Sequence, residues 1–177
     1  MKTLIVIDMQ NDFIDGTLGT PEAQAIVPNV KRKIDEFMAS NNPVIFTRDT
    51  HPKNYLETQE GKLLPVEHCI CGSEGWKISE VVADLNTQAK AFDVIDKDTF
   101  GYHSWGMYEK DFEGCDEIVL VGLCTDICVV SNALCIKAVY PEIKITVDAS
   151  CCAGVTPETH KAALTTMKMC QINVIGE

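Results

Sequence analysis

The sequence has few basic residues, no long apolar run and no repeated or low-complexity segment. Its 177 residues contain 15 Lys plus Arg against 26 Asp plus Glu, which gives a formal net charge of −11. Nucleic acids and anionic membrane surfaces need a basic patch on the protein, so this deficit argues against both as partners. The first apolar run, Leu4 to Ile7, is too short for a signal peptide or a membrane span. We expect a cytoplasmic protein that acts on a small molecule.

The composition is that of a chain with an ample core. Hydrophobic residues make up 46% of the sequence, and the length suits a single domain over residues 1–177. The nine cysteines are expected to be reduced thiols, because no secretory signal is present and a core of this size needs no disulfides. The adjacent Cys151 and Cys152 are expected to be packing residues.

Short apolar runs alternate with segments of helical periodicity along the chain. This alternation predicts one doubly wound α/β fold, a mostly parallel sheet with helices on both faces. Strands are expected at residues 4–7, 44–47, 92–96, 117–121, 143–147 and 172–175. Helices are expected from Pro28 to the Asn41-Asn42-Pro43 stop, over 78–85, 105–112 and 126–139, and from Pro157 to 170. Residues 48–76 have no clear period, and a loop of that length is usually functional.

Three reactive side chains follow expected strands. Asp8, Lys97 and Cys128 come from distant segments, but the carboxyl ends of parallel strands share one edge, where they could meet. Cys128 falls in the first turn of a helix, with Thr125 as the expected N-cap. The free N–H groups and the dipole there stabilise a thiolate and can hold an oxyanion. Each residue alone is usually structural, but together they offer a base, a cation and a nucleophile.

The long loop carries residues suited to a metal ion. Asp49 and His51 lie on one side of an extended segment, and Glu57 and His68 follow. A mixed carboxylate and imidazole set suits zinc, iron or manganese. Hydrogen-bonded loop histidines with solvated acids would explain the same residues, and the local sequence leaves that alternative open.

Four motifs in order resemble one family along the whole chain. They are Asp8 to Phe13, Arg48 to Pro52, Lys97 before Thr99-Phe100, and Gly122 to Cys128. In order and spacing the chain resembles the isochorismatase-like cysteine hydrolases, and the nicotinamidases in particular. The resemblance implies a catalytic triad of Asp8, Lys97 and Cys128. It also implies a cis peptide between Leu123 and Cys124, which would aim the backbone N–H groups of Cys124 and Cys128 at an oxyanion.

The resemblance also implies a metal. Nicotinamidases bind one through an Asp-x-His pair and a later His next to a Cys, which match Asp49, His51 and His68-Cys69. Glu57 is the expected remaining ligand, and Glu60 is its substitute. Zinc is the expected ion, with manganese or iron as alternatives, whereas isochorismatases of the same fold lack this site.

The resemblance implies hydrolysis of a small carboxamide through a thioester acyl-enzyme. The expected reaction is nicotinamide to nicotinate and ammonia, a step of NAD salvage. Phe13 matches a substrate-stacking aromatic residue. Many nicotinamidases place a tryptophan where this chain has Pro65, so the second aromatic wall would come from Trp76, Tyr102 or Trp105. Relatives often form dimers or tetramers, and we expect a homo-oligomer.

Two other functions stay open from the sequence. A hydrolase of the same fold could act on another amide or on isochorismate. A redox protein in which Cys124 resolves an oxidised Cys128 is the third interpretation.

Overall fold

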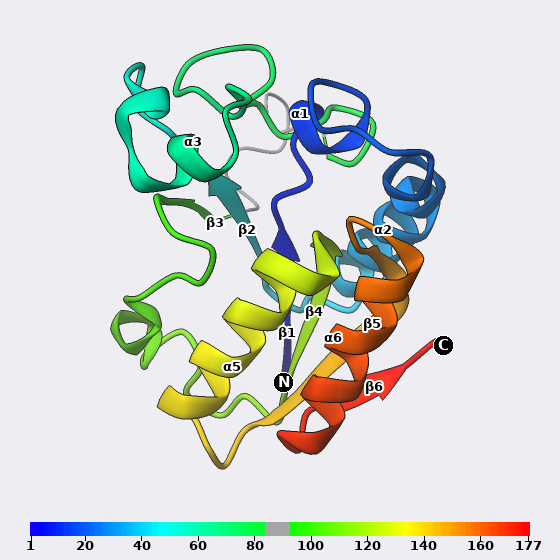
Figure 1. Ribbon diagram of the computed structural model, residues 1–177. Coiled ribbons are helices and arrows are strands. Elements are labelled where there is room, and N and C mark those ends of the chain that lie inside the picture. Colours follow the sequence, from blue (N-terminus) through cyan, green and yellow to red (C-terminus); the bar gives the residue numbers. More distant parts are fainter. Residues whose placement is uncertain (84–92) are drawn as a thin grey trace.

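The computed structural model describes residues 1–83 and 93–177, and its centre is a parallel β-sheet (Figure 1). Six strands lie in the order β3-β2-β1-β4-β5-β6, and every described pair is parallel. Their bounds are β1 (Lys2–Ile7), β2 (Val44–Asp49), β3 (Asp93–Lys97), β4 (Glu117–Leu123), β5 (Lys144–Ala153) and β6 (Asn173–Ile175). The predicted fold class is confirmed.

Helices cover both faces of the sheet. Leu4 and Val6 of β1 belong to one buried cluster together with side chains of α2 (Pro21–Ala39). Ile5 and Ile7 point the other way, into a second cluster with α5 (Val130–Val139) and α6 (Pro157–Met169). Figure 1 shows α5 and α6 together on one side of the sheet and α2 on the other. Because both faces are covered, the inner strands are continuous apolar runs.

The first long helix begins earlier than the sequence predicted. It starts at Pro21, and Pro28 lies inside it. Thr20 is the N-cap, and its hydroxyl accepts a hydrogen bond of 3.0 Å from the N–H of Ala23. A capping threonine followed by proline is a stronger start signal than proline alone. The buried stripe already begins at Ala23, so the prediction of a start at Pro28 was wrong.

Three other predicted helices differ from the structure. Residues 78–83 form no helix, and residues 84 and 85 lie outside the described part of the chain. The predicted helix over 105–112 is a single 3-10 turn, η2 (Trp105–Tyr108). The helix expected over 126–139 begins with one π turn, η3 (Thr125–Val129), and continues as α5. The remaining short elements are α1 (Asn11–Ile14), η1 (Tyr55–Glu57) and α3 (Gln59–Leu63).

The chain reverses its winding direction between β1 and β4. From β1 it builds outward through β2 to β3, and then returns to place β4 on the other side of β1. Ligands of open α/β sheets bind in the crevice at such a switch point. Gly122 allows the close approach of the two strands there, because its φ is +118° and a Cβ atom would lie 2.1 Å from the carbonyl oxygen of Ile7.

No helix in the described ranges is long and apolar enough to cross a membrane.

Candidate active site

Asp8, Lys97 and Cys128 meet in the crevice at the switch point, and we call them the nucleophile cluster. The Lys97 Nζ atom lies 2.7 Å from Oδ2 of Asp8 and donates to Sγ of Cys128 at 3.5 Å. Asp8 directly follows β1, Lys97 ends β3, and Cys128 lies in η3 just after β4. All three residues are at most 4% exposed. The structure therefore brings together the three residues that the strand ends predicted.

Asp8 is held in place by its neighbour on β2. Its backbone has a left-handed φ of 46°, which lets the chain turn as soon as β1 ends. The Thr47 hydroxyl donates to Oδ1 of Asp8 at 2.6 Å and accepts from the Asp8 N–H at 3.2 Å. Because Thr47 fixes one carboxylate oxygen and Lys97 the other, the carboxylate has little freedom to rotate. Thr47 was not predicted from the sequence, where it is indistinguishable from an ordinary β-branched strand residue.

Burial dominates the protonation of the nucleophile cluster. It raises the pKa of the Cys128 thiol well above the usual value, although the Lys97 ammonium works in the opposite direction. Burial also raises the pKa of Asp8, again against the effect of Lys97. For Lys97, burial would lower the pKa, but the charges of Asp8, Cys128 and Asp49 outweigh it and the pKa is raised. The resting cluster is therefore a protonated thiol beside an ion pair, and the raised pKa of Asp8 makes it a stronger base.

The helix that carries Cys128 starts differently from the prediction. Cys124 is the N-cap and makes no side-chain capping bond, whereas Thr125 lies inside the π turn. The Thr125 hydroxyl instead forms a 2.8 Å hydrogen bond with Nδ1 of His160 on α6. A nearby loop is fastened as well, because the Val155 N–H donates to the Asp126 carboxylate. The role expected for Thr125 was wrong, since its side chain ties the turn to α6.

The peptide bond between Leu123 and Cys124 is cis, as the resemblance implied. The Cys124 carbonyl accepts hydrogen bonds from the N–H groups of Ile127 and Val129, at 3.1 and 3.0 Å. Burial raises the pKa of the Cys124 thiol to about 12, so this side chain is an uncharged wall of the site at neutral pH.

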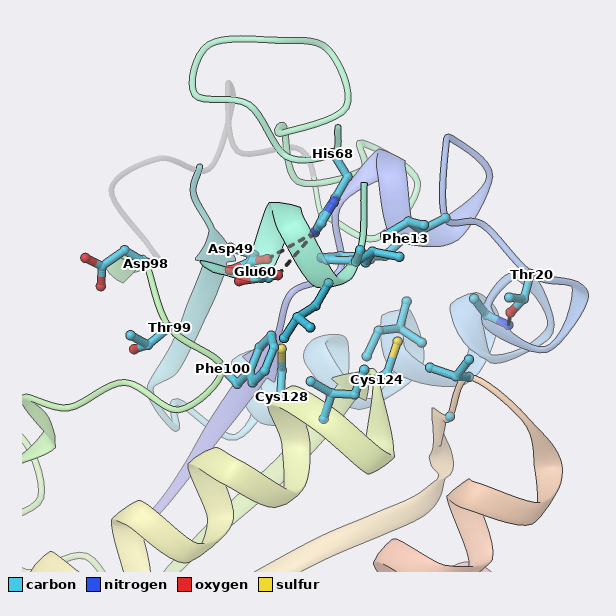
Figure 2. A pocket seen from close by; sticks show the side chains of 18 of the residues that line it. Phe13, Thr20, Asp49, Glu60, His68, Asp98, Thr99, Phe100, Cys124 and Cys128 are labelled. Atoms are coloured by element: carbon cyan, nitrogen blue, oxygen red, sulfur yellow. Dashed lines mark hydrogen bonds and ion pairs between the residues drawn. The ribbon is translucent and has the colours of Figure 1, made fainter. Parts of the chain in front are cut away.

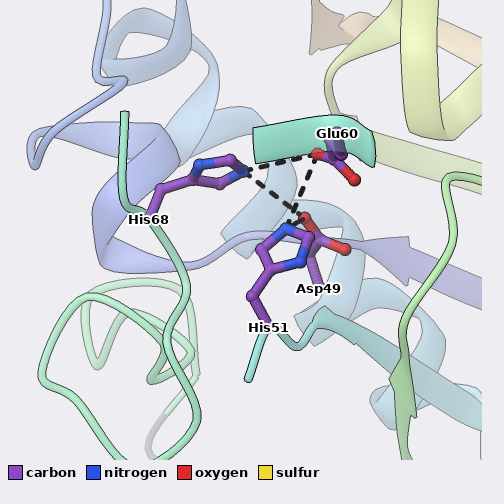
Figure 3. Close-up of side chains that lie close together, drawn as sticks. All are labelled: Asp49, His51, Glu60 and His68. Carbon is purple, nitrogen blue, oxygen red and sulfur yellow. Dashed lines mark ion pairs between the residues drawn. The ribbon is translucent and has the colours of Figure 1, made fainter. Parts of the chain in front are cut away.

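Four side chains beside the nucleophile cluster lie close enough together to hold a metal ion, and we call them the metal-binding group: Asp49, His51, Glu60 and His68 (Figure 3). One potential ligand atom of each lies within 4.8 Å of the others. The Nε2 atom of His51 is 3.0 Å from Oδ2 of Asp49 and 3.6 Å from Oε1 of Glu60. The Nε2 atom of His68 is 3.8 Å from each of the same two oxygens. Two imidazoles and two carboxylates therefore converge on one point.

The residues present fit a divalent transition metal. The Nε2 atom of His51 is buried and makes no hydrogen bond within the described residues, although an Asp49 oxygen is near. Nδ1 of His68 lies 2.8 Å from the carbonyl oxygen of Val66, which directs its Nε2 into the group. A buried ring nitrogen without a hydrogen bond, facing two carboxylates, is what a metal ion would satisfy. Nitrogen and oxygen donors suit zinc, manganese or iron better than calcium.

Glu60, and not Glu57, completes this group. The expected ligand Glu57 is exposed at the end of η1, where one of its oxygens accepts from the Asn54 side chain at 3.3 Å. Thr58 then caps α3 by accepting from the Gly61 N–H, and this turn brings Glu60 to the inner side. A Cβ atom at Gly61 would lie 2.1 Å from the Tyr55 carbonyl oxygen, so glycine permits the tight turn. The prediction of Glu57 is corrected to its substitute.

Gln10 supports the metal-binding group from behind, and nothing in the sequence marks it beyond its place in the Asp8 to Phe13 motif. Its side chain is fully buried, accepts from the Asp49 N–H at 2.7 Å and donates to the Asp49 carbonyl at 2.9 Å. A second donated bond reaches the carbonyl of Trp76. Gln10 thus fixes the end of β2, from which Asp49 faces both Lys97 and the two histidines.

A pocket of about 710 Å³ joins the two groups (Figure 2). Cys128 and Cys124 lie on its floor, and Asp49, Glu60 and His68 lie at one end. Phe13 lines the wall, with its ring centroid 5.6 Å from that of His68. The rest of the lining is mostly apolar: Leu18, Ala23, Leu63, Leu64, Phe100, Leu123, Ile127 and Val155. A ligand in this pocket can therefore contact both Cys128 and the metal-binding group.

The other aromatic residues predicted for this pocket lie elsewhere. Trp105 is fully buried in the second core cluster, and Tyr102 packs edge-on against it. The Trp76 ring stacks under the Arg48 guanidinium, with 3.7 Å to the ring centroid, and its indole N–H donates to Thr50. None of the three lines the pocket. The second aromatic residue there is Phe100, which the motif contained but the sequence did not single out.

The fold and the site together define a doubly wound α/β protein with a buried cysteine, lysine and aspartate at the switch point and a metal-binding group beside them. Residues 2–176 match the family model described as the isochorismatase domain, so the chain belongs to the isochorismatase family. This confirms the resemblance inferred from the motifs.

Named relatives are similar over the whole length. The pyrazinamidase/nicotinamidase of Streptococcus mutans UA159 has a TM-score of 0.86 and 28% identity, covering 99% of this chain and 100% of that one. The pyrazinamidase of Pyrococcus horikoshii, solved in complex with zinc, has a TM-score of 0.82 and 26% identity over 99% of both chains. The nicotinamidase of Saccharomyces cerevisiae is 24% identical over 218 aligned residues that cover both chains fully.

Proposed function

We propose that this protein is a cysteine amidohydrolase that converts nicotinamide, or a closely related aromatic carboxamide, to the carboxylate and ammonia. The observation that carries the proposal is the position of the Lys97 ammonium, within 3.5 Å of the thiol and within ion-pair distance of both Asp8 and Asp49. This arrangement supplies a nucleophile, a base and a cation at the floor of a pocket that could hold an aromatic ring. The nicotinamidase and pyrazinamidase relatives support the same reaction class.

The first half of the reaction forms an acyl-enzyme. Asp8 takes the proton of the Cys128 thiol as Sγ attacks the amide carbon, and the carbonyl electrons move to oxygen. The backbone N–H groups of Cys124 and Cys128 hold this oxyanion, and one such donor contributes about 2.7–4 kcal/mol where it has been measured. Asp8 then gives its proton to the departing nitrogen, the C–N bond breaks, and ammonia leaves a thioester on Cys128.

The second half releases the acid. Asp8 takes a proton from a water molecule as the water oxygen attacks the thioester carbon. The same two N–H groups hold the second oxyanion. The C–S bond then breaks, the Cys128 sulfur regains a proton through Asp8, and the acid leaves and loses its remaining proton to solvent as the carboxylate. Lys97 compensates the negative charge that moves between Asp8 and Cys128 in each step.

The metal-binding group would hold one divalent transition metal, and we propose zinc. Asp49, His51, Glu60 and His68 would be its ligands, and the ion would supply a Lewis-acid contact for a ring nitrogen or for a water molecule. Phe13 would stack on the substrate ring beside His68. Asp49 faces both the metal-binding group and Lys97, so it would couple ring binding to the charge of the nucleophile cluster.

Isochorismate is a poorer substrate for this pocket. It carries two carboxylates, yet the pocket lining contains no lysine or arginine in the part of the chain that the structure describes. With the proposed metal bound, the charges of Asp49 and Glu60 would be offset by the ion, and Asp98 would leave the lining with a net negative charge that repels a dianion. An uncharged amide meets no such repulsion.

The direct test is ammonia release from a panel of small amides by the zinc-loaded protein. Nicotinamide and pyrazinamide are expected to be hydrolysed, and isochorismate is expected to remain unchanged. Turnover of isochorismate without any release of ammonia from the amides would contradict the proposal.

A cytoplasmic location and assembly as a dimer or tetramer belong to the same proposal, and light scattering on the purified protein tests the assembly.

A further inference from the structure

The pocket is larger than the proposed substrate and extends away from the metal-binding group. In Figure 2, Asp49 and Glu60 lie above Cys128, whereas Cys124 and Thr20 lie to its right, away from the metal-binding group. A volume of about 710 Å³ lies in the range of roughly 300–1,000 Å³ that encloses drug-sized ligands, whereas nicotinamide is a single pyridine ring with one carboxamide. A ring held between Phe13 and the metal-binding group would leave the far end of the pocket empty.

The segments around Thr20 and Cys124, which Figure 2 places at this end, contribute apolar side chains to the pocket lining. Leu18 and Ala23 come from the loop and helix after α1, Ile127 comes from η3, and Val155 comes from the loop between β5 and α6. Thr20 is the nearest hydroxyl, but it already serves as the N-cap of α2. The loop at Val155 is fastened to η3 through Asp126, so this wall is tied to the nucleophile's helix.

The charge of the site restricts what can occupy this end. No lysine or arginine lines it among the described residues, and the protein carries a net charge of −11. An anionic group would therefore find no counter-ion there, and a strongly polar group would lose hydrogen bonds to water without replacing them. Aliphatic walls favour an uncharged apolar group instead.

The lining also includes two leucines of the loop that carries the metal-binding group. Leu63 and Leu64, which precede Pro65, line the pocket. Leu63 is 80% exposed, so the mouth is open and aliphatic. A flat aromatic wall fits a single ring, whereas flexible aliphatic side chains accept a bulkier ligand.

From these features we propose a second subsite, lined by Leu18, Ala23, Ile127 and Val155, that binds an uncharged apolar substituent on the ring of the substrate. The inference rests on the proposed function and narrows its substrate class to apolar-substituted aromatic carboxamides. The substituent lies on the acyl part of the amide, because the ring would be at the metal-binding group and the leaving nitrogen would be at Asp8.

The test measures kcat/KM for nicotinamide and for a set of butylnicotinamides. Each derivative carries one butyl group, at a different free carbon of the ring. At least one butyl derivative is expected to exceed nicotinamide about tenfold or more, because buried methylene groups discriminate by at least that factor in apolar pockets. The same derivative ending in a carboxylate is expected to lose this advantage. N-butylnicotinamide is expected to be a poor substrate, because its butyl group is on the leaving nitrogen and would lie at Asp8, outside the subsite.

Val155→Trp fills the subsite from an exposed position and should lower the ratio of butyl to unsubstituted kcat/KM about tenfold. Val139→Trp is the matched control, because Val139 is a similarly exposed valine, at the end of α5 and away from the pocket, and its variant should keep the wild-type ratio. Leu18→Trp enters the subsite from the opposite wall and replaces Val155→Trp if that variant does not fold.

The outcomes separate the two proposals. Hydrolysis of nicotinamide with no butyl derivative faster, or a ratio that neither tryptophan variant changes, overturns the subsite and leaves the proposed function intact. A preference for N-butylnicotinamide would also overturn it. If the zinc-loaded protein releases ammonia or amine from none of the amides, both the proposed function and the subsite fail.

Discussion

The nucleophile cluster and the metal-binding group lie at the same edge of the sheet, but different parts of the chain hold them. Asp8 and Lys97 stand at or next to strand ends, and Cys128 stands in the first helical turn after β4. In the metal-binding group only Asp49 belongs to a strand, and the other three members lie on residues 50–76, among short turns and loops. The sheet fixes the first set, whereas local capping and the binding of an ion must fix the second.

This difference has a thermodynamic meaning. The nucleophile cluster is preformed, with its ion pair at 2.7 Å and a supporting hydrogen bond from Thr47. The metal-binding group brings two carboxylates and two imidazoles together, with a buried ring nitrogen that makes no hydrogen bond. Bringing such donors together is unfavourable until a cation binds, so this part of the molecule is expected to depend on its metal. The two regions should therefore fail separately when they are mutated.

The largest effect is expected from Cys128→Ala. It removes the nucleophile and should lower kcat for nicotinamide by at least about 10⁴-fold, as for other nucleophile deletions. The variant should still bind one metal per chain, because no ligand is changed. Steady-state ammonia release and elemental analysis measure both, and Cys170→Ala, which changes an exposed thiol, should match the wild type. Loss of metal in Cys128→Ala would contradict the expectation that the two regions fail separately.

The converse variant is His51→Ala. Removing a direct ligand should lower metal affinity by about 100-fold or more, beyond the effect of most outer-shell changes, and activity should fall with it. Alkylation of Cys128 by iodoacetamide should continue, since the thiol does not need the metal. His103→Ala, at an exposed histidine, is the control. A variant that retains metal and activity would exclude His51 as a ligand.

A comparison of Glu60→Gln with Glu57→Gln tests which of the two glutamates is the metal ligand. The Glu60 variant should weaken metal binding by at least the roughly 10–100-fold that outer-shell changes cause, because a neutral amide replaces a ligating carboxylate. The Glu57 variant should bind metal like the wild type. The Glu57 side chain is exposed, and its hydrogen bond to a described residue is the one it accepts from Asn54. Competition with a chelator measures both affinities, and the reverse order would restore Glu57 as the ligand.

A smaller effect is expected on the ionisation of the thiol. Burial raises the Cys128 pKa while Lys97 opposes it, so Lys97→Met should raise this pKa further. At a pH below the pKa, each unit of further rise lowers the thiolate fraction about tenfold, so alkylation at neutral pH should slow and its profile should move to higher pH. Iodoacetamide rates against pH measure the shift. Lys33→Met removes a lysine that pairs with Asp148 away from the site and should leave the profile unchanged. An identical profile for Lys97→Met would mean that this lysine does not act on the thiol.

The two regions also differ in how far the sequence predicts them. Strand ends are marked by apolar runs, and parallel strands bring their ends to one edge, so the pattern of the sequence alone predicts that Asp8, Lys97 and Cys128 lie together. Periodicity does not describe a loop. The capped turn at Thr58 decides that Glu60 and not Glu57 faces inward, and no hydrophobic pattern shows this.

The aromatic residues failed for a related reason. An aromatic side chain near a motif can line a pocket or fill the core, and the sequence does not distinguish the two. Trp105 fills the core, whereas Phe100 is 45% exposed at the pocket. The start of α2 was misplaced because two prolines could each begin a helix, and only the Thr20 cap decides between them.

The central claim is that Cys128 carries a thioester during amide hydrolysis. Acid quenching of the zinc-loaded wild type during turnover of nicotinamide, followed by intact-mass and peptide mass spectrometry, tests it most directly. A nicotinoyl adduct is expected on the peptide that contains Cys128, and none is expected in Cys128→Ala. Hydrolysis of nicotinamide by Cys128→Ala at the wild-type rate, or an adduct on another residue, would contradict it.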